Sequence, residues 1–248
     1  MQELSIIIPA YNEEKRISKT LEDYSVFFKR LYKNNFEIIV ILNGCRDKTI
    51  EVVKPIAKKY KQIKYKNIKE AIGKGGAVIE GFKQADGRLI GFVDADNSTK
   101  PEAYYDLVKN INGHDCIIAS RWIKGAKVSP KQPLTRRIAS RTFNLIVRVL
   151  FRIDIHDSQC GAKLFKKEAV KKIIPKLGIT RWAFDVDLLY QIKRDKGRIY
   201  EIPTMWNDAP GSKLDVKKAS KEMFLAIARL RLIYSPFKFI VKIYDKLT

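Results

Sequence analysis

Two carboxylates, Asp94 and Asp96, stand directly after an apolar run of the sequence, Leu89–Val93. The run has the length and composition of a buried strand, and residues two apart at a strand end face roughly the same way. Two hard oxygen ligands in that arrangement suit a divalent cation such as Mg²⁺ or Mn²⁺, with positions left for the phosphates of a substrate. The alternative is an Asp-rich turn whose polar residues cap the helix that Pro101 opens.

A second polar motif, Pro9 to Glu13, follows the first predicted strand. An aromatic ring such as that of Tyr11 can stack on a nucleotide base there, and the side chains of Asn12 and Glu13 can form hydrogen bonds with a base or ribose. The alternative is a plain turn from strand to helix with Asn12 as the cap.

A third motif, Gly73-Lys74-Gly75-Gly76, opens a predicted helix. Glycines let backbone N–H groups approach a phosphate, the amino terminus of a helix favours its negative charge, and Lys74 adds a cation. The motif matches neither the P-loop pattern nor the dinucleotide-binding pattern G-x-G-x-x-G. It therefore disfavours a P-loop ATPase and a dinucleotide-dependent oxidoreductase.

These motifs lie in a chain whose apolar periodicity alternates between strands and helices. The predicted strands are Leu4–Pro9, Phe36–Leu42, Ile63–Tyr65, Leu89–Val93, Cys116–Ser120, a strand-like end to Asp157–Phe165, and Arg198–Trp206. The predicted helices are Glu13–Leu31, Asp47–Tyr60, Gly75–Ala85, Pro101–Ile111, Arg136–Phe151 and Ala183–Lys196. Such alternation predicts an α/β fold with a mostly parallel sheet covered by helices, whose ligands bind at the carboxyl ends of the strands.

Taken together, the strand-end motifs resemble the inverting family-2 nucleotide-sugar glycosyltransferases with the GT-A fold. The motifs that carry this resemblance are Ile7–Glu14, Asn43–Thr49, Gly73–Ala77 and Asp94-Ala95-Asp96. Downstream motifs resemble the polyprenyl-phosphate branch of that family, dolichyl-phosphate β-glucosyltransferases most of all and mannose synthases next. These are Ser120-Arg121, Asp157–Phe165, Arg181–Leu189 and Gly211–Leu214, and the resemblance spans residues 4–234.

The resemblance implies transfer of a sugar to dolichyl or another polyprenyl phosphate, with inversion at the anomeric carbon. The sugar that it favours is glucose, from UDP-glucose. It implies Asp96, Asp157 and Arg121 as catalytic residues, with Asp157 as the candidate base, and a metal, Mg²⁺ or Mn²⁺, held by Asp96 and Asp94. The implied residues for the nucleotide-sugar donor are Pro9, Tyr11, Glu13, Asn43, Lys74, Gly75, Asp94, Asp96 and Gln159. The alternative within this branch is mannose transfer from GDP-mannose.

Cations are needed at the acceptor side, because the donor diphosphate and the lipid phosphate are both anions. The candidates for holding the acceptor phosphate are Arg121, Arg136, Arg137 and Lys213, since guanidinium groups can bind phosphate through two hydrogen bonds. For Arg136 and Arg137 the alternative is a solvated or lipid-facing side of a helix.

One motif departs from the family. Members usually carry Asp-Asp-Gly-Ser after the second strand, and this chain has Leu42-Asn43-Gly44-Cys45. The second Asp commonly contacts the nucleotide base in relatives. An amide at Asn43 can still donate and accept, but it carries no charge, so the base preference stays open.

The chain has 49 Lys and Arg against 27 Asp and Glu, a formal net charge of +22. Such a surface attracts polyanions, which include nucleic acid and anionic membranes. No nucleic-acid-binding motif is visible and the strand-end carboxylates would repel phosphates without a metal, so we expect no nucleic-acid partner. A catalytically silent protein that binds sugar nucleotides is a third alternative, against which the retained Asp94, Asp96, Arg121 and Lys213 argue.

Residues 136–152 and the tail 216–248 mix apolar stretches with Lys and Arg, as helices of a membrane interface do. We therefore expect a catalytic domain over residues 1–215 and an amphipathic helical tail over 216–248, broken at Ser235-Pro236. No signal peptide and no transmembrane segment are expected, which predicts a peripheral protein on the cytoplasmic face of a membrane. The alternatives for the tail are a contact within a homo-oligomer or packing on the domain.

Overall fold

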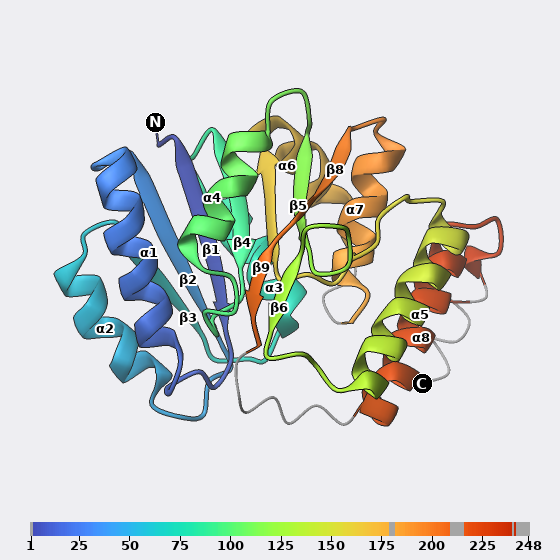
Figure 1. The fold of residues 1–248 in the computed structure, drawn as a ribbon, viewed down its shortest axis with the longest axis horizontal. Coiled ribbons are helices and arrows are strands. Elements are labelled where there is room, and N and C mark those ends of the chain that lie inside the picture. Colours follow the sequence, from blue (N-terminus) through green and yellow to red (C-terminus); the bar gives the residue numbers. More distant parts are fainter. Residues whose placement is uncertain (1, 179–181, 209–215, 240, 242–248) are drawn as a thin grey trace.

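A seven-stranded sheet forms the centre of the protein, with the strand order β3-β2-β1-β4-β7-β5-β8 (Figure 1). All of its neighbouring strands are parallel except at β7, which runs antiparallel to β4 and β5. The computed structural model describes residues 2–178, 182–208, 216–239 and 241. The predicted α/β class with a mostly parallel sheet is confirmed.

The strands follow the predicted apolar runs closely. They are β1 (Leu4–Ala10), β2 (Phe36–Asn43), β3 (Ile63–Ile68), β4 (Leu89–Val93), β5 (Cys116–Ser120), β7 (Ala162–Lys166) and β8 (Ile199–Pro203). A small second sheet pairs β6 (Lys127–Ser129) with β9 (Met205–Asn207). β1, β2, β4 and β5 are buried over nearly their whole length, as expected for strands covered on both faces.

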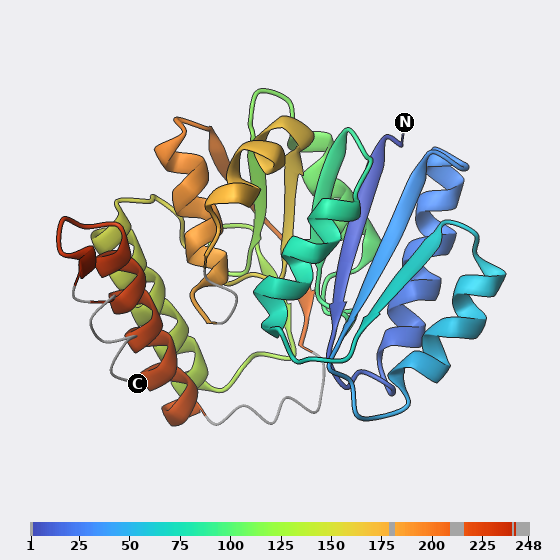
Figure 2. The ribbon, with the colours of Figure 1, turned by 180° about the vertical axis from the view of Figure 1, so that it is seen from behind.

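Helices cover both faces of the sheet (Figures 1 and 2). On one face, α1 (Ile17–Tyr32), α2 (Thr49–Lys59) and α4 (Pro101–Asn110) pack on one set of strand side chains. On the other face, α3 (Gly73–Gln84), α6 (Lys167–Ile173) and α7 (Phe184–Arg194) pack on the alternate set. A 3₁₀ turn, η1 (Ile174–Lys176), follows α6.

Two long helices, α5 (Leu134–Phe151) and α8 (Val216–Ile233), lie side by side at one end of the molecule (Figures 1 and 2). Ile227 and Leu230 of α8 are fully buried and belong to the same core cluster as Val147 of α5. The first helix of the predicted tail therefore packs on the rest of the protein. Most of the second predicted piece, beyond Pro236, lies outside the described residues, and no described helix is long and apolar enough to cross a membrane.

Two predictions about elements were wrong in detail, and two elements were missed. The predicted strand Arg198–Trp206 is two strands in different sheets, because β8 ends at Pro203 and Thr204 then exchanges backbone hydrogen bonds with Ser120 and Lys127. α1 begins at Ile17 rather than Glu13, since the Glu13 carbonyl already accepts from Arg16 and Ile17 in a preceding turn. β6 and α6 were not predicted at all.

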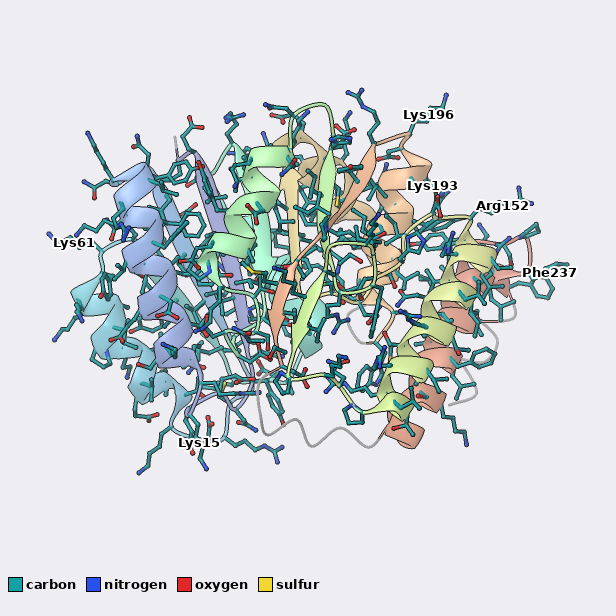
Figure 3. The ribbon with its side chains drawn as sticks, in the orientation of Figure 1. Lys15, Lys61, Arg152, Lys193, Lys196 and Phe237 are labelled. Atoms are coloured by element: carbon teal, nitrogen blue, oxygen red, sulfur yellow. The ribbon has the colours of Figure 1, made fainter. Side chains whose placement is uncertain are left out.

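The large positive charge is carried on the outside of the molecule. Figure 3 shows Lys15, Lys61 and Lys196 at its periphery, pointing away from the sheet, and all three are exposed. Solvated ammonium groups of this kind cost little to the fold and set the long-range field of the surface.

Candidate active site

The carboxyl ends of β1, β2, β4 and β5 lie at one edge of the sheet, the lower edge in Figure 1. The loop after β4, which carries Asp94 and Asp96, is fixed there by two hydroxyl groups of α1. Thr20 Oγ1 donates to the Ala95 carbonyl at 2.7 Å, and Tyr24 Oη donates to the Thr99 carbonyl at 2.9 Å. The loop therefore has its geometry set by the scaffold before any ligand binds.

Asp94 pairs with the lysine of the glycine-rich motif. Lys74 Nζ lies 2.6 Å from Asp94 Oδ1, so the motif that opens α3 and the carboxylates after β4 meet as predicted. Burial acts to lower the pKa of Lys74, but the carboxylates of Asp94 and Asp185 outweigh it and raise that pKa. Gly161 makes room for Asp94, since a Cβ at that position would lie 1.9 Å from Asp94 Oδ2.

Asp96 and Glu13 add two more carboxylates to this cluster. Burial raises the pKa of Asp96, and the neighbouring charge of Asp94 raises it further. Burial also raises the pKa of Glu13, with smaller contributions from Asp96 and Asp94, although Arg16 opposes the shift from 2.7 Å away. The cluster thus holds more negative charge than its own cations neutralise.

This acidic cluster fits a divalent cation held together with substrate. Mutual repulsion between Asp94 and Asp96 is what a cation would relieve, and their carboxylate oxygens are the ligands that Mg²⁺ and Mn²⁺ prefer. Within the described part of the chain, no three His, Cys, Asp or Glu side chains are grouped to bind a metal on their own. A metal here would accordingly complete its coordination with phosphate oxygens and water, as Mg²⁺ commonly does.

Arg121 and Asp157 form a buried ion pair beside the cluster. Nε and Nη2 of Arg121 each donate to one carboxylate oxygen of Asp157 at 2.8 Å, and the Arg121 backbone N–H donates to Oδ2 at 2.9 Å. The guanidinium also lies 4.9 Å from the centre of the Trp206 ring. Both oxygens of Asp157 are engaged in this geometry, which favours a positioning role for the pair over proton transfer.

Two predicted donor residues, Asn43 and Gly75, have additional structural partners, and a third, Gln159, has a buried donor without one among the described residues. Asn43 Oδ1 accepts from the Ile72 backbone N–H at 2.7 Å, which ties the end of β2 to the loop before α3. At Gly75 a Cβ would lie 2.5 Å from the Phe184 ring, so the glycine allows α3 and α7 to approach closely. Gln159 Nε2 is buried with no acceptor among the described residues, which suits a group that donates to a ligand.

The remaining predicted site residues are partly dispersed. Tyr11 is 51% exposed after β1, and Pro9 is half-buried within that strand. Arg136 lies at the start of α5, 3.6 Å from Asp208, and Arg137 is half-buried next to it. Lys213 lies outside the described residues.

A second buried ion pair was not predicted. Lys163, which is fully buried on β7, donates from Nζ to Asp185 Oδ1 at 2.5 Å and to the Cys160 carbonyl at 2.7 Å. Asp185 stands in the first turn of α7 and contributes to the pKa of Lys74. The sequence signals for this pair were a lysine inside an apolar strand and an Asp-Val-Asp run that begins 22 residues later in the chain.

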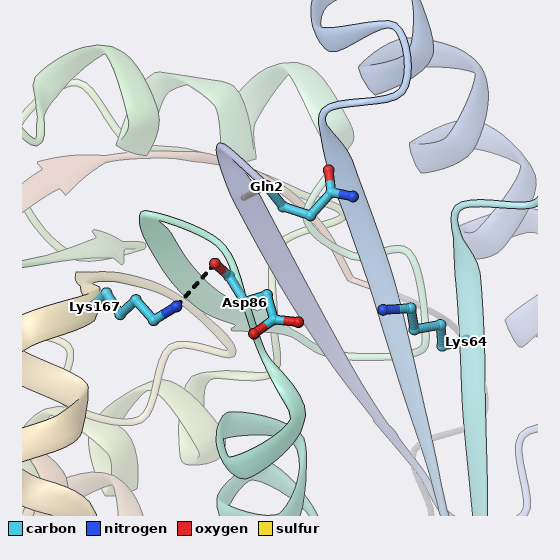
Figure 4. Close-up of a pocket in the computed structure, with 4 residues that line it drawn as sticks. All are labelled: Gln2, Lys64, Asp86 and Lys167. Carbon is cyan, nitrogen blue, oxygen red and sulfur yellow. Dashed lines mark hydrogen bonds between the residues drawn. The ribbon is translucent and has the colours of Figure 1, made fainter.

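The pocket in Figure 4 lies at the opposite edge of the sheet, where the parallel strands begin. Its residues are Gln2, Lys64, Asp86 and Lys167, and Lys167 Nζ donates to the Asp86 carbonyl at 3.0 Å. It shares no residue with the acidic cluster.

Residues 5–174 match the sequence profile described as Glycosyl transferase family 2. The chain belongs to this family. The family-2 glycosyltransferase domain thus spans every strand from β1 to β7 and both carboxylates after β4.

Several curated relatives of this glycosyltransferase are dolichyl-phosphate β-glucosyltransferases. That of Dictyostelium discoideum is 35% identical over 93% of this chain and 74% of its own length. One from Trichomonas vaginalis is 34% identical over 93% of this chain and 73% of its own length. The human enzyme is 33% identical over 86% of this chain and 70% of its own length.

Solved structures share the GT-A fold. Glucosyl-3-phosphoglycerate synthase from Mycobacterium tuberculosis, in complex with Mn²⁺, uridine diphosphate and phosphoglyceric acid, superposes with a TM-score of 0.70 at 15% identity. The match covers 95% of this chain and 80% of that one. A mannosyltransferase from Pyrobaculum calidifontis, in complex with GDP-mannose and Mn²⁺, has a TM-score of 0.60 at 18% identity over 85% of this chain and 58% of that one.

Proposed function

We propose that this glycosyltransferase moves glucose from UDP-glucose onto dolichyl or another polyprenyl phosphate, with inversion at the anomeric carbon and with a divalent metal. The observation that carries the proposal is the acidic cluster of Asp94, Asp96 and Glu13 beside Lys74, at the strand ends of a family-2 domain. The substrate assignment is supported by the names of the curated relatives, which are dolichyl-phosphate β-glucosyltransferases.

The donor side is assigned to the loops after β1, β2 and β4 together with the start of α3. Asp96 and Asp94 would hold the metal, which supplies Lewis-acid stabilisation to the leaving diphosphate. Lys74 lies close enough to Asp94 to share in neutralising that diphosphate. Tyr11 would stack on the base, while Pro9, Glu13, Asn43, Gly75 and Gln159 shape the remainder of the donor site.

The acceptor side is assigned to the region around Arg121 and the start of α5. A phosphate monoester is already anionic near neutral pH, so its oxygen needs no strong general base before it attacks the anomeric carbon. The buried pair of Arg121 with Asp157 positions the loop after β5 beside the sugar, which gives Asp157 a positioning role in place of the base expected from the resemblance. Arg136, Arg137 and Lys213 would provide the cations for the incoming phosphate.

The chain also carries a surface suited to a lipid substrate. α5 exposes the apolar side chains of Leu134, Ile138, Leu145 and Val149, and α8 exposes Phe224 and Leu225. These apolar groups alternate with arginine and lysine along both helices, a composition that favours an anionic membrane interface. We assign this pair of helices to peripheral membrane binding, which would bring the site to the end of the isoprenoid.

The test is a transfer assay on purified protein with Mn²⁺ or Mg²⁺ and a short polyprenyl phosphate, offering UDP-glucose and GDP-mannose separately. Lipid-linked glucose from the UDP donor supports the proposal. Lipid-linked mannose would instead assign the GDP-mannose reaction, which the uncharged Asn43 in the base region leaves open. Nucleotide binding without any product would indicate a different acceptor or a catalytically silent relative.

A further inference from the structure

A pocket of about 260 Å³ lies between α5 and the two connectors that face it. Its lining residues are Trp122, Arg141, Asn144, Leu145, Arg148 and His156. Trp122 follows the β5 strand directly after Arg121, and His156 directly precedes Asp157. We call this the Trp122 pocket; it adjoins the Arg121–Asp157 pair through the chain itself.

The Trp122 pocket presents donors that lack acceptors. Arg141 forms no ion pair with any described residue, and its guanidinium lies 5.3 Å from the centre of the Trp122 ring. The Trp122 indole N–H is buried and has no acceptor in the described part of the chain. An unpaired guanidinium beside an unpaired buried N–H is an arrangement that an anion completes.

The other polar groups of the pocket do not satisfy the donors of Arg141 and Trp122. Arg148 pairs with Asp154 at 2.7 Å, but that carboxylate is 83% exposed, so water weakens the pair. His156 Nδ1 lies 3.0 Å from Glu201, whose side chain is largely buried and also accepts from the His156 backbone N–H. The side-chain oxygen of Asn144 accepts hydrogen bonds from the backbone N–H and the hydroxyl of Ser158, so it does not compete with an anion for the donors of the pocket.

An apolar surface begins at the rim of the pocket. Leu145 lines the pocket and is 58% exposed, and it belongs to the exposed row of α5 that includes Ile138 and Val149. A ligand that fills both features has a phosphate-like head and a hydrocarbon chain. The Trp122 ring contacts both Arg141 and, at 5.8 Å, Arg121, which connects the pocket to the transfer site rather than to a remote surface.

We propose that the Trp122 pocket binds the phosphate head of the isoprenoid phosphate acceptor outside the transfer site, as an entry site on its way to the sugar. This inference rests on the proposed function for the identity of the acceptor. It assigns Arg141 and the Trp122 indole N–H a binding role that Arg136 and Arg137, one to two turns earlier on α5, do not cover.

The test is a calorimetric titration of the intact protein with citronellyl phosphate, a short isoprenoid phosphate, without metal or sugar nucleotide. Arg141→Gln is expected to weaken binding about tenfold, the loss of a charge-assisted hydrogen bond, and Trp122→Phe about threefold. Arg152→Gln, an exposed residue at the end of the same helix, is the control for net charge and is expected to bind like the wild type.

Inorganic phosphate and dihexanoyl phosphatidylglycerol are titrated in parallel to identify the source of the phosphate. Weaker binding of both than of citronellyl phosphate supports the entry site. If inorganic phosphate bound as tightly as citronellyl phosphate, the hydrocarbon chain would contribute nothing to recognition. If the phospholipid bound as tightly, the pocket would be a contact to the bilayer. Either result overturns the proposal. Unchanged affinity in both pocket variants would overturn it as well.

Failure of this inference and of the proposed function can be told apart. The titration needs no turnover, so loss of binding in Arg141→Gln in a protein that transfers no glucose would leave the pocket standing and reject the function. Normal glucosyl transfer together with unaltered binding in Arg141→Gln would support the function and reject the pocket.

Discussion

Arg121 donates from Nε and Nη2 to the two carboxylate oxygens of Asp157, and the pair is sealed between β5 and the connector before β7. Asp157 is fully buried and the Arg121 side chain is 10% exposed. Burial acts to lower the pKa of Arg121, but Asp157 outweighs it and raises that pKa, so the guanidinium stays charged. Each member of the pair would be an uncompensated buried charge without the other.

Asp157→Asn is therefore expected to destabilise the protein by about 3 kcal/mol, because it leaves the Arg121 charge buried without its counterion. The free energy of unfolding in urea measures this. Glu3→Gln, which breaks the exposed pair of Glu3 with Arg88 at 3.0 Å, is the matched control and is expected to cost less than about 1 kcal/mol. An equal decrease in the free energy of unfolding in the two variants would show that the buried pair stabilises the protein no more than an exposed one.

Gly161→Ala is expected to displace Asp94, since the added Cβ would lie 1.9 Å from Asp94 Oδ2. The affinity for Mn²⁺ in the presence of UDP should fall about tenfold or more, which calorimetry can measure. Gly178→Ala is the control, because a Cβ there meets no atom of the described residues within 4 Å. Unaltered Mn²⁺ affinity in Gly161→Ala would show that Asp94 does not contribute to metal binding.

Asp96→Asn is expected to stabilise the metal-free protein at neutral pH. The pKa of Asp96 is raised by burial and by Asp94, so the folded state holds its proton more tightly than the unfolded state. Stability is accordingly lost as pH rises from the ordinary carboxyl pKa through the raised value, and the variant escapes that loss. A Tm gain on the order of 2 °C at neutral pH, vanishing below about pH 4, is expected.

Mn²⁺ provides the internal control for that experiment. It should raise the Tm of the wild type with UDP present, because it binds only the folded state, and should raise that of Asp96→Asn much less. A Tm difference between Asp96→Asn and the wild type that is no larger at neutral pH than at acid pH would contradict the assigned repulsion between Asp96 and Asp94.

Membrane binding can be tested without removing α8, whose Ile227 and Leu230 are part of the core. Ile138→Ser with Val149→Ser removes two side chains of α5 that are 56% and 68% exposed. Each buried side chain of this kind contributes roughly 1.5 kcal/mol or more, so binding to phosphatidylglycerol vesicles should fall at least about tenfold in sedimentation. Val26→Ser on α1 is the control, and equal sedimentation of all three proteins would reject α5 as the membrane contact.

The strands that carry the site were predictable because each is a buried run ended by a polar motif. The alternation of strands and helices placed Asp94, Asp96 and Lys74 at strand ends, and the family resemblance joined them in one donor site; in the structure Lys74 pairs with Asp94 and lies within the field of Asp96. The antiparallel insertion of β7 was not predictable in the same way, since its apolar pattern does not encode direction. The Lys163–Asp185 pair depends on that insertion, so it too required the tertiary structure.

Partners of single side chains were the least predictable features. Arg121 and Asp157 were each predicted to act on substrate, and their mutual ion pair emerges only when the loop after β5 meets the connector before β7. Asn43 was considered only as a contact to the base, whereas its hydrogen bond to Ile72 depends on how β2 faces the start of α3. Such contacts are set by packing between segments far apart in the chain.

The most direct test of the account is the formation of lipid-linked glucose by purified protein from UDP-glucose, Mn²⁺ and dolichyl phosphate, followed by mass spectrometry and by NMR of the anomeric proton. We predict a β-linked glucosyl phosphate, whose formation is at least about a hundredfold slower with Asp96→Ala and is abolished by chelation of the metal. An α-linked product, or undiminished transfer by Asp96→Ala, would contradict it.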